Sequence, residues 1–282
     1  MSIAPQYIPA AYSLTAVGVW GASDFLGGMG ARRANAFLFT AIVHISGMVL
    51  MGTLALMTRA PFPGNASLGW SLVAGSVGGT ALALFYRSLA SGNMGLVAPV
   101  AAVVGAAIPT IVTAFTEGFP GYRHALGFVV AGIGVWLISR AEGNTGRPQG
   151  LGMAVLAGVG FAGFYLCIHQ AGDASALWAS ACSRVGSLLV TGAIVLFGGY
   201  LRAVPAPVLS IAAVAGSLDI TGSAVFIRAA QIGRLDDAVV LSSLYPAVTV
   251  LLARFILNEH FTRWKALGMV AALLAVPMIA WR

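Results

Sequence analysis

The stretch VAGSVGGTALALFYRSLASG at residues 73–92 returns in altered form as VAGSLDITGSAVFIRAAQIG at residues 214–233. Nine of the twenty positions are identical, a phenylalanine and an arginine among them. The offset between the two copies is 141 residues, which is half of the 282-residue chain. A second pair of stretches, ALGFVVAGIGVWLI at 125–138 and ALGMVAALLAVPMI at 266–279, stands in the same register. Two matches at one offset indicate an internal duplication.

The composition indicates a protein whose solvent is the lipid bilayer. Apolar residues make up 59% of the chain and charged residues 8%, with a mean hydropathy of +0.92, whereas soluble domains carry about 25% charged residues. The net charge of +7 does not indicate nucleic acid, because the basic residues are scattered near the ends of apolar runs instead of gathering on one face. Such placement is typical of side chains that anchor helices at the membrane interface.

Ten apolar segments are long enough to cross a membrane, which takes about 20 helical residues. They lie at 8–28, 36–58, 68–90, 94–116, 122–140, 151–171, 175–199, 207–231, 235–257 and 264–281. A polar linker, AEGNTGRPQG at 141–150, separates the fifth segment from the sixth. The first segment is expected to be a retained span, because it lacks the basic stretch that precedes the apolar core of a cleaved signal peptide.

Each half of the chain holds five spans, an odd number, so the second half enters the membrane in the opposite orientation. We therefore predict an all-α integral membrane protein with ten transmembrane helices arranged as two inverted five-helix repeats, residues 1–141 and 142–282. The repeat is clearest for the third to fifth spans of each half, where it pairs Phe85 with Phe226. In secondary transporters of this architecture the substrate site lies near the midplane, between the halves.

Two further stretches resemble a known family. VGVWGASDF at 17–25 resembles the Trp-Gly signature in the first helix of the EamA-domain transporters. LYPAVTVLLARFILNEHFTRWKALGMV at 244–270 is similar to that family's proline-to-glutamate stretch. Pro246, Glu259 and Gly268 stand in the places that the family pattern expects.

The first half carries a blurred version of that pattern. Glu117 and Gly127 fit it, whereas Pro99 and Pro109 fall out of register with Pro246. The resemblance covers essentially the whole chain and implies the drug/metabolite transporter superfamily, most like the bacterial aromatic amino acid exporters. It also implies the bacterial inner membrane, with both termini in the cytoplasm. The basic residues of the loops alone would place the termini outside, so the orientation rests on the resemblance.

Carboxylates are scarce within the predicted spans, where a central charge costs about 2.5–3.5 kcal/mol on insertion scales. Asp219 lies near the middle of the eighth span, at the position where the first copy of the repeat has Gly78. Two interpretations of Asp219 stay open: a residue of the transport pathway, or a structural partner of Arg184 in the seventh span. Asp24 lies near the end of the first span, where an arginine of the following loop could pair with it.

Aromatic, hydroxyl and proline residues complete the candidate site. Trp20 is expected to line the central cavity, where a ring-bearing substrate could stack against it. A proline within a span frees a backbone carbonyl that can face the cavity. The predicted substrate-binding residues are Trp20, Ser23, Asp24, Ser76, Thr80, Pro99, Tyr165, His169, Asp219, Ser243 and Tyr245. No catalytic or metal-binding residue is predicted, because no histidine has a second ligand at metal spacing.

The sequence predicts a secondary transporter that exports amino acids, aromatic and other apolar ones, or related metabolites by alternating access. The chain has no GxxxxGK[ST] loop for a nucleotide, and its few carboxylates leave proton exchange and uncoupled facilitation both open. A multidrug or lipophilic-cation exporter is the alternative. An intramembrane enzyme is a remote one, since no acid–base or metal cluster converges. We expect a monomer without cofactors whose partners are a small molecule and the lipid bilayer, and no nucleic acid.

Overall fold

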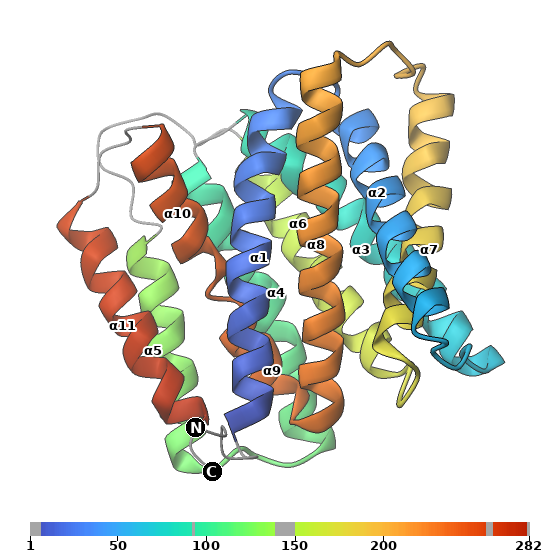
Figure 1. Ribbon diagram of the computed structural model, residues 1–282. Helices are drawn as coiled ribbons and strands as arrows, with labels where there is room; N and C mark the ends of the chain where they lie inside the picture. Colours follow the sequence, from blue (N-terminus) through green and yellow to red (C-terminus); the bar gives the residue numbers. More distant parts are fainter. Residues whose placement is uncertain (1–6, 92–93, 139–149, 258–261, 281–282) are drawn as a thin grey trace.

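The computed structural model describes residues 7–91, 94–138, 150–257 and 262–280. Within these ranges the chain forms helices and no strand (Figure 1). The helices are α1 (Ile8–Ala31), α2 (Ala36–Met57), α3 (Asn65–Ser91), α4 (Met94–Thr116), α5 (Tyr122–Ile138), α6 (Leu151–His169), α7 (Ala176–Phe197), α8 (Ala206–Ile232), α9 (Leu235–Ser242), α10 (Tyr245–Ile256) and α11 (Arg263–Ala280). Glu259, the boundary between the repeats and nearly all of the predicted linker lie outside the described residues.

The ten predicted spans are confirmed, with ends that differ by a few residues, but the ninth span is broken in two. Its first part, α9, ends at Ser242, and its second part, α10, begins at Tyr245. Proline lacks an N–H donor and its ring crowds the carbonyl four residues earlier, so Pro246 explains why α9 stops at Ser242. Pro99 and Pro109, in contrast, lie inside α4, which continues through both.

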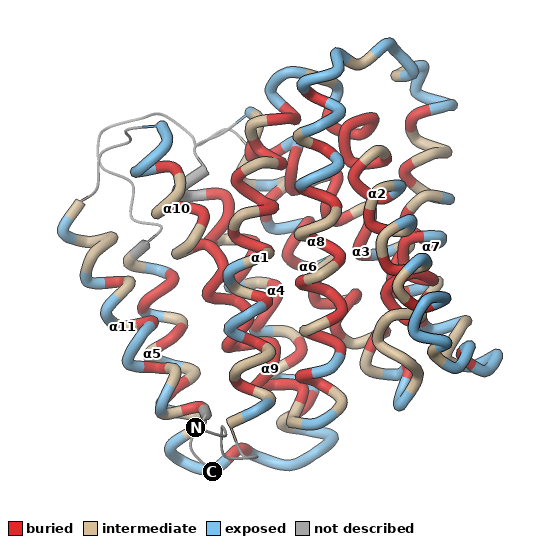
Figure 2. The backbone as a smooth tube through the Cα atoms, viewed as in Figure 1, coloured by how far each residue is buried: buried red, intermediate tan, exposed pale blue. Residues whose placement is uncertain are grey.

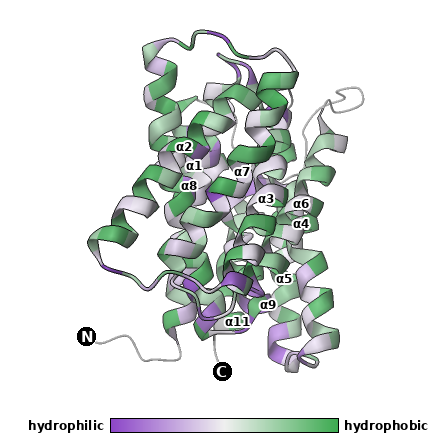
Figure 3. Ribbon diagram, turned by 90° about the vertical axis from the view of Figure 1, so that its right-hand side faces the viewer, coloured by the Kyte–Doolittle hydropathy of each residue, from purple (hydrophilic) through white to green (hydrophobic). Residues whose placement is uncertain are grey.

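The outside of the bundle is apolar, as a lipid environment requires. Seven helical segments within the described ranges are long and apolar enough to cross a membrane by length and composition. Figure 3 shows hydrophobic residues along most of the length of the helices, and exposed side chains include Leu56, Phe115 and Phe197. Buried residues follow the faces that α1, α4 and α8 turn toward the middle of the bundle (Figure 2). The fold is that of an all-α membrane protein.

The two halves are interlaced, and their contacts follow the repeat. α1 packs against α8, while α6, the counterpart of α1, packs against α3, the counterpart of α8. In the same way α3 packs against α7 and α8 against α2. The pairs α2–α7 and α5–α11 join one counterpart to the other. Exchanging the halves therefore leaves these helix pairings unchanged, as a two-fold relation between them requires.

Counterpart helices run in opposite directions through the bundle. In Figure 1, α8 descends from the top of the view, whereas α3 starts at the lower right and rises. α1 begins and α11 ends at the same, lower end of the bundle. The architecture is thus two inverted five-helix repeats, related by an axis in the plane of the membrane.

Two glycines of the repeat bring α3 and α8 into backbone contact with their partners. A Cβ atom on Gly75 would collide with the carbonyl oxygen of Ser183 in α7, and a Cβ atom on its counterpart Gly216 would collide with the carbonyl oxygen of Val43 in α2. The Ser187 hydroxyl donates a hydrogen bond of 2.8 Å to the Gly75 carbonyl across the same interface. Small residues allow this approach between membrane helices, and the duplication preserved it on both sides.

Gly75→Ala and Gly216→Ala are each expected to lower the free energy of unfolding by about 1–3 kcal/mol, because a backbone carbonyl cannot yield to the added methyl group. Thermal unfolding of the purified protein in detergent measures the effect. Gly69→Ala in α3 is the matched control, since nothing lies within 4 Å of the position where its Cβ would be. A Gly75→Ala protein that melts at or above the wild-type temperature would contradict the close approach.

Candidate functional site

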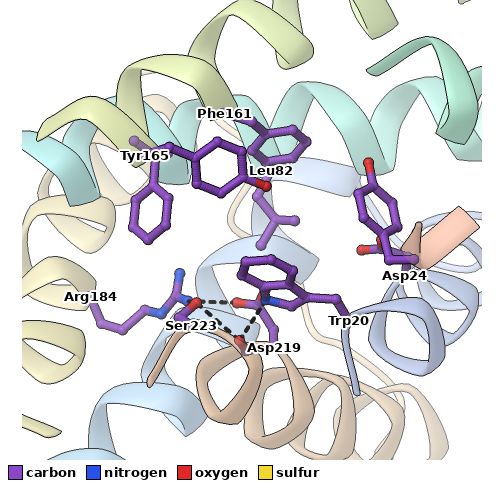
Figure 4. Close-up of a pocket in the computed structure, with 11 residues that line it drawn as sticks. Trp20, Asp24, Leu82, Phe161, Tyr165, Arg184, Asp219 and Ser223 are labelled. Carbon is purple, nitrogen blue, oxygen red and sulfur yellow. Dashed lines mark hydrogen bonds and ion pairs between the residues drawn. The ribbon is translucent and has the colours of Figure 1, made fainter. Parts of the chain in front are cut away.

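A cavity lies at the centre of the bundle, between helices of both halves (Figure 4). Its lining residues are Trp20, Asp24, Gly78, Leu82, Phe161, Phe164, Tyr165, Arg184, Asp219, Ser223 and Tyr245. The volume that the centre of a water molecule can reach within it is ≈ 50 Å³, which is room for a few water molecules. A substrate that carries a ring therefore requires the walls to move apart.

Arg184 of α7 organises the polar side of the cavity. Its Nη2 atom lies 2.8 Å from Oδ2 of Asp219 and donates a hydrogen bond of 3.0 Å to the Ser223 hydroxyl, both in α8. The contact with Asp219 is an ion pair without the alignment of a hydrogen bond. Nη1 lies 3.3 Å from Nδ1 of His44 in α2. The guanidinium group thus links α7 to α2 and α8, and its charge is balanced by Asp219.

Aromatic rings form much of the remaining cavity wall. Trp20 of α1 donates from its indole nitrogen to the backbone carbonyl of Asp219 at 3.0 Å. Its ring lies 6.2 Å from that of Tyr165 and 5.6 Å from that of Phe226, and the latter two rings are 4.8 Å apart. Figure 4 shows Tyr165 and Phe161 facing Trp20 across the cavity. A flat ring could insert between these walls once they separate.

Asp24 is the second carboxylate of the cavity, and its setting differs from that of Asp219. Only 5% of Asp24 is exposed, and it lies on the side of the cavity away from Arg184 (Figure 4). Among the described residues, no hydrogen bond or ion pair reaches its carboxylate. The sequence had suggested an interfacial position and an arginine partner from the next loop. Instead α1 continues to Ala31, so Asp24 lies within the helix and faces inward.

The repeat builds the cavity wall twice. Four pairs of lining residues are related by the 141-residue offset: Trp20 with Phe161, Asp24 with Tyr165, Gly78 with Asp219, and Leu82 with Ser223. The positions that line the cavity are thus symmetric, but their side chains are not. In three of the four pairs, an aspartate or serine of one half corresponds to a tyrosine, glycine or leucine of the other.

The structure brings together five of the predicted site residues: Trp20, Asp24, Tyr165, Asp219 and Tyr245 line the cavity. Tyr245 begins α10, and its hydroxyl lies 3.5 Å from the Ala98 carbonyl of α4. The break in the ninth span therefore places this ring at the cavity.

The other predicted residues do not line the cavity. The hydroxyl of Ser23 donates to the Ala215 carbonyl at 2.8 Å and so joins α1 to α8. Three hydroxyls donate to backbone carbonyls three or four residues earlier in the chain: Ser76 to Leu72, Thr80 to Ser76, and Ser243 to Val240, at 2.9, 2.8 and 2.7 Å. Pro99 is buried within α4.

His169 lies at one end of the bundle. It is in the last turn of α6, with its Nε2 atom 3.7 Å from Oε1 of Glu117. It borders a separate cleft with Asp173 and Gln231. A role in substrate binding would therefore be at an entrance instead of the centre.

Sequence reasoning missed Phe161, Phe164, Leu82 and Ser223, and it considered Arg184 chiefly as a partner for Asp219. One signal could have found Phe161: the offset of the repeat, applied to Trp20, leads to it directly. A search for identical residues in the two copies could not have found Phe161, because the paired residues of the cavity wall differ in type. Within the described residues, no group of three or more His, Cys, Asp or Glu side chains could hold a metal ion.

Comparisons with known proteins agree with the fold. No curated protein matches this chain in sequence. In three dimensions 17 solved chains match it, and one crystal structure superposes with a TM-score of 0.75 at 15% identity, covering 97% of this chain and 98% of that chain. The family model described as the EamA-like transporter family matches residues 148–281, which comprise α6 to α11. The second half of this chain is therefore similar to an EamA-like transporter domain.

Proposed function

We propose that this protein is a secondary transporter that exports amino acids with aromatic or other apolar side chains across the bacterial inner membrane. The walls of the central cavity separate and close alternately toward the two sides, and the chain acts as a monomer with both termini in the cytoplasm. The EamA-like domain supports a transporter of small molecules. The choice of substrate rests on the cavity.

The observation that carries this proposal is the composition of the cavity wall. Aromatic rings from Trp20, Phe161 and Tyr165 face one another, while Arg184 and the two aspartates supply charges of both signs at the edges. An amino acid with an apolar side chain has this same combination, a ring or alkyl group joined to one cation and one anion. A sugar phosphate would require more than the one guanidinium that lines the cavity.

Counterflow in liposomes tests the proposal. Purified protein reconstituted into vesicles that are loaded with unlabelled phenylalanine should accumulate labelled phenylalanine transiently, and the label should be recovered unchanged. Empty vesicles are the control. Chemical conversion of the label would indicate an enzyme, and the absence of counterflow with phenylalanine, tryptophan, methionine and threonine would contradict amino acid transport.

A lipophilic-cation exporter is the second candidate. The carboxylate of Asp24, with which no described residue forms a hydrogen bond or ion pair, suits an organic cation as well as an ammonium group. The same vesicles separate the two functions. Tetraphenylphosphonium carries rings and a positive charge but no carboxylate. If it exchanges and the amino acids do not, the cation exporter is the correct assignment.

A further inference from the structure

We propose that Asp24 is the cation subsite of the central cavity, where the ammonium group of the substrate and a proton bind in turn. This inference rests on the proposed function and deepens it. It assigns the ammonium group of the substrate to one residue, and it states that a proton occupies that residue when the substrate is absent. It also assigns the exchange of protons to Asp24 and leaves Asp219, the carboxylate that the sequence emphasised, as the structural partner of Arg184.

The first step of the argument is the contrast between the two carboxylates. Asp219 has a permanent counter-charge, because Arg184 lies 2.8 Å from it and is held in place by Ser223 and His44. Asp24 is as deeply buried, 5% exposed against 7% for Asp219, and faces the same cavity. No hydrogen bond or ion pair reaches it from any described residue. Its position is that of a carboxylate with its partner missing.

The second step is the energetic consequence of that position. An ionised carboxylate buried without a partner is strongly unfavourable, so such a group takes up a proton or pairs with a cation. Inside a membrane, ionisable groups in this situation mark pathways for protons and ions. When the cavity is empty, Asp24 satisfies this condition by carrying a proton. When a substrate is bound, an ammonium group can replace that proton.

The third step is the set of groups around Asp24. Asp219 of α8, Tyr86 of α3, Tyr165 of α6 and Tyr245 of α10 interact with it electrostatically. Arg184 of α7 lies across the cavity (Figure 4), and Nδ1 of His44 in α2 lies 3.3 Å from its Nη1 atom.

The other helices packed on α1 add no charge at this place. The acidic residues of α9, Asp236 and Asp237, do not line the cavity, and no titratable residue of α11 does. The surroundings of Asp24 are therefore aromatic rings and one further carboxylate. Both attract a cation, the rings through their negatively charged faces.

The fourth step places the three groups that branch from the central carbon of an amino acid. With the ammonium group at Asp24, the carboxylate on the same carbon atom is directed to the side of the cavity where Arg184 lies, and the ring branches from that carbon toward Trp20 and Phe161 (Figure 4). Only one half of the protein offers this arrangement, because the counterpart of Asp24 in the repeat is Tyr165.

The exchange of proton and substrate balances. When the ammonium group binds, the O–H bond of the Asp24 carboxyl breaks, the electron pair stays on oxygen, and the proton passes to water on the side to which the cavity is open. When the substrate leaves, the carboxylate takes a proton from water on the other side. Each substrate molecule exported is thus exchanged for one proton moving inward, and a proton gradient can drive export.

The test uses wild-type protein, Asp24→Asn and Asp24→Glu in liposomes, with labelled phenylalanine in counterflow. Two competitors divide the substrate: phenethylamine has the ring and the ammonium group, and 3-phenylpropionate has the ring and the carboxylate. Asp24→Asn should weaken inhibition by phenethylamine about 30-fold or more, since one partner of a buried charge pair is lost. Inhibition by 3-phenylpropionate should change by less than about threefold. Asp24→Glu, which keeps a carboxylate, should restore strong inhibition by phenethylamine.

The second readout is the pH dependence. In the wild type, phenethylamine should bind more tightly as the pH rises from about 5.5 to about 8, because it competes with a proton while its own alkylammonium group stays charged. Asp24→Asn should bind it equally at all these pH values. Asp173→Asn, which removes an exposed carboxylate near the end of the bundle, should behave as the wild type.

Several results would overturn the inference. One is an unchanged inhibition constant of phenethylamine in Asp24→Asn. The others are an equal weakening of inhibition by both competitors, or phenethylamine binding that still depends on pH in Asp24→Asn. Binding of phenethylamine is also measured by thermal shift of the purified protein, which requires no transport. If the wild type moves no amino acid but binds phenethylamine through Asp24, the proposed function fails and the cation subsite stands. If Asp24→Asn does not fold, a wild-type phenethylamine constant that is independent of pH contradicts the proposal.

Discussion

Replacing Arg184 with methionine is expected to lower the free energy of unfolding by about 3–5 kcal/mol, because it leaves the buried carboxylate of Asp219 without a counter-charge. Arg184 is 5% exposed and contacts Asp219, Ser223 and His44, so the substitution removes a link that joins α2, α7 and α8. Thermal and denaturant unfolding in detergent measure the loss.

A double substitution separates the charge from the size of the side chain. Removing both charges, in Arg184→Gln with Asp219→Asn, keeps hydrogen-bonding groups in place and should recover all but about 1 kcal/mol, the net worth of a hydrogen bond. Arg228→Met removes an exposed arginine at the end of α8 and should change stability by no more than about 0.5 kcal/mol. If the double variant is as unstable as Arg184→Met alone, packing and not the ion pair accounts for the loss.

Trp20→Ala is expected to abolish counterflow and to lower stability by about 3–5 kcal/mol, as truncation of a buried tryptophan does. The ring is 8% exposed, contacts the rings of Tyr165 and Phe226, and donates a hydrogen bond to the Asp219 carbonyl. It therefore joins α1 to α8 as well as forming part of the cavity wall. Counterflow and thermal unfolding are both measured, since the two losses have different causes.

Trp20→Phe and Gly222→Ala divide these causes. Phenylalanine keeps a ring in the wall but has no N–H donor, so stability should fall by only about 1 kcal/mol while phenylalanine transport persists. A Cβ atom on Gly222 would lie 2.5 Å from Cδ1 of Trp20. Gly222→Ala should therefore displace the Trp20 ring without removing it, and so weaken transport. Normal counterflow in Trp20→Ala would show that this ring is not part of the substrate path.

The repeat and the spans could be predicted from the sequence, because each depends on patterns of many residues. Apolar runs of sufficient length predict membrane helices however their residues vary, and the 141-residue offset survives in residues such as Gly75 and Gly216, where the approach of two backbones admits nothing larger. The break between α9 and α10 is less predictable. Pro99, Pro109 and Pro246 look alike in sequence, and only the last interrupts its span.

The cavity was predictable only in part, for a different physical reason. Trp20 and Asp219 stand out because a tryptophan or a carboxylate in an apolar helix is rare. Phe161 and Leu82 are ordinary lipid-phase residues, and only the packing of α6 and α3 shows that they face inward. Whether Asp24 or Asp219 has a partner depends on which helix lies opposite, which is a property of the fold.

The helices of the two halves are arranged symmetrically, but the side chains that line the cavity differ between the halves. This difference has a consequence for the transport of solute in the two directions. If the halves exchange conformations, the inward-open and outward-open forms are not mirror images in energy, because Asp219 and Ser223 replace Gly78 and Leu82 in one half. One form is then the resting form, and the Michaelis constants measured from the two faces differ. By detailed balance, this difference in energy cannot create a gradient of solute by itself. It determines how fast the substrate binds from each side of the membrane. The driving gradients alone determine the side on which the solute accumulates.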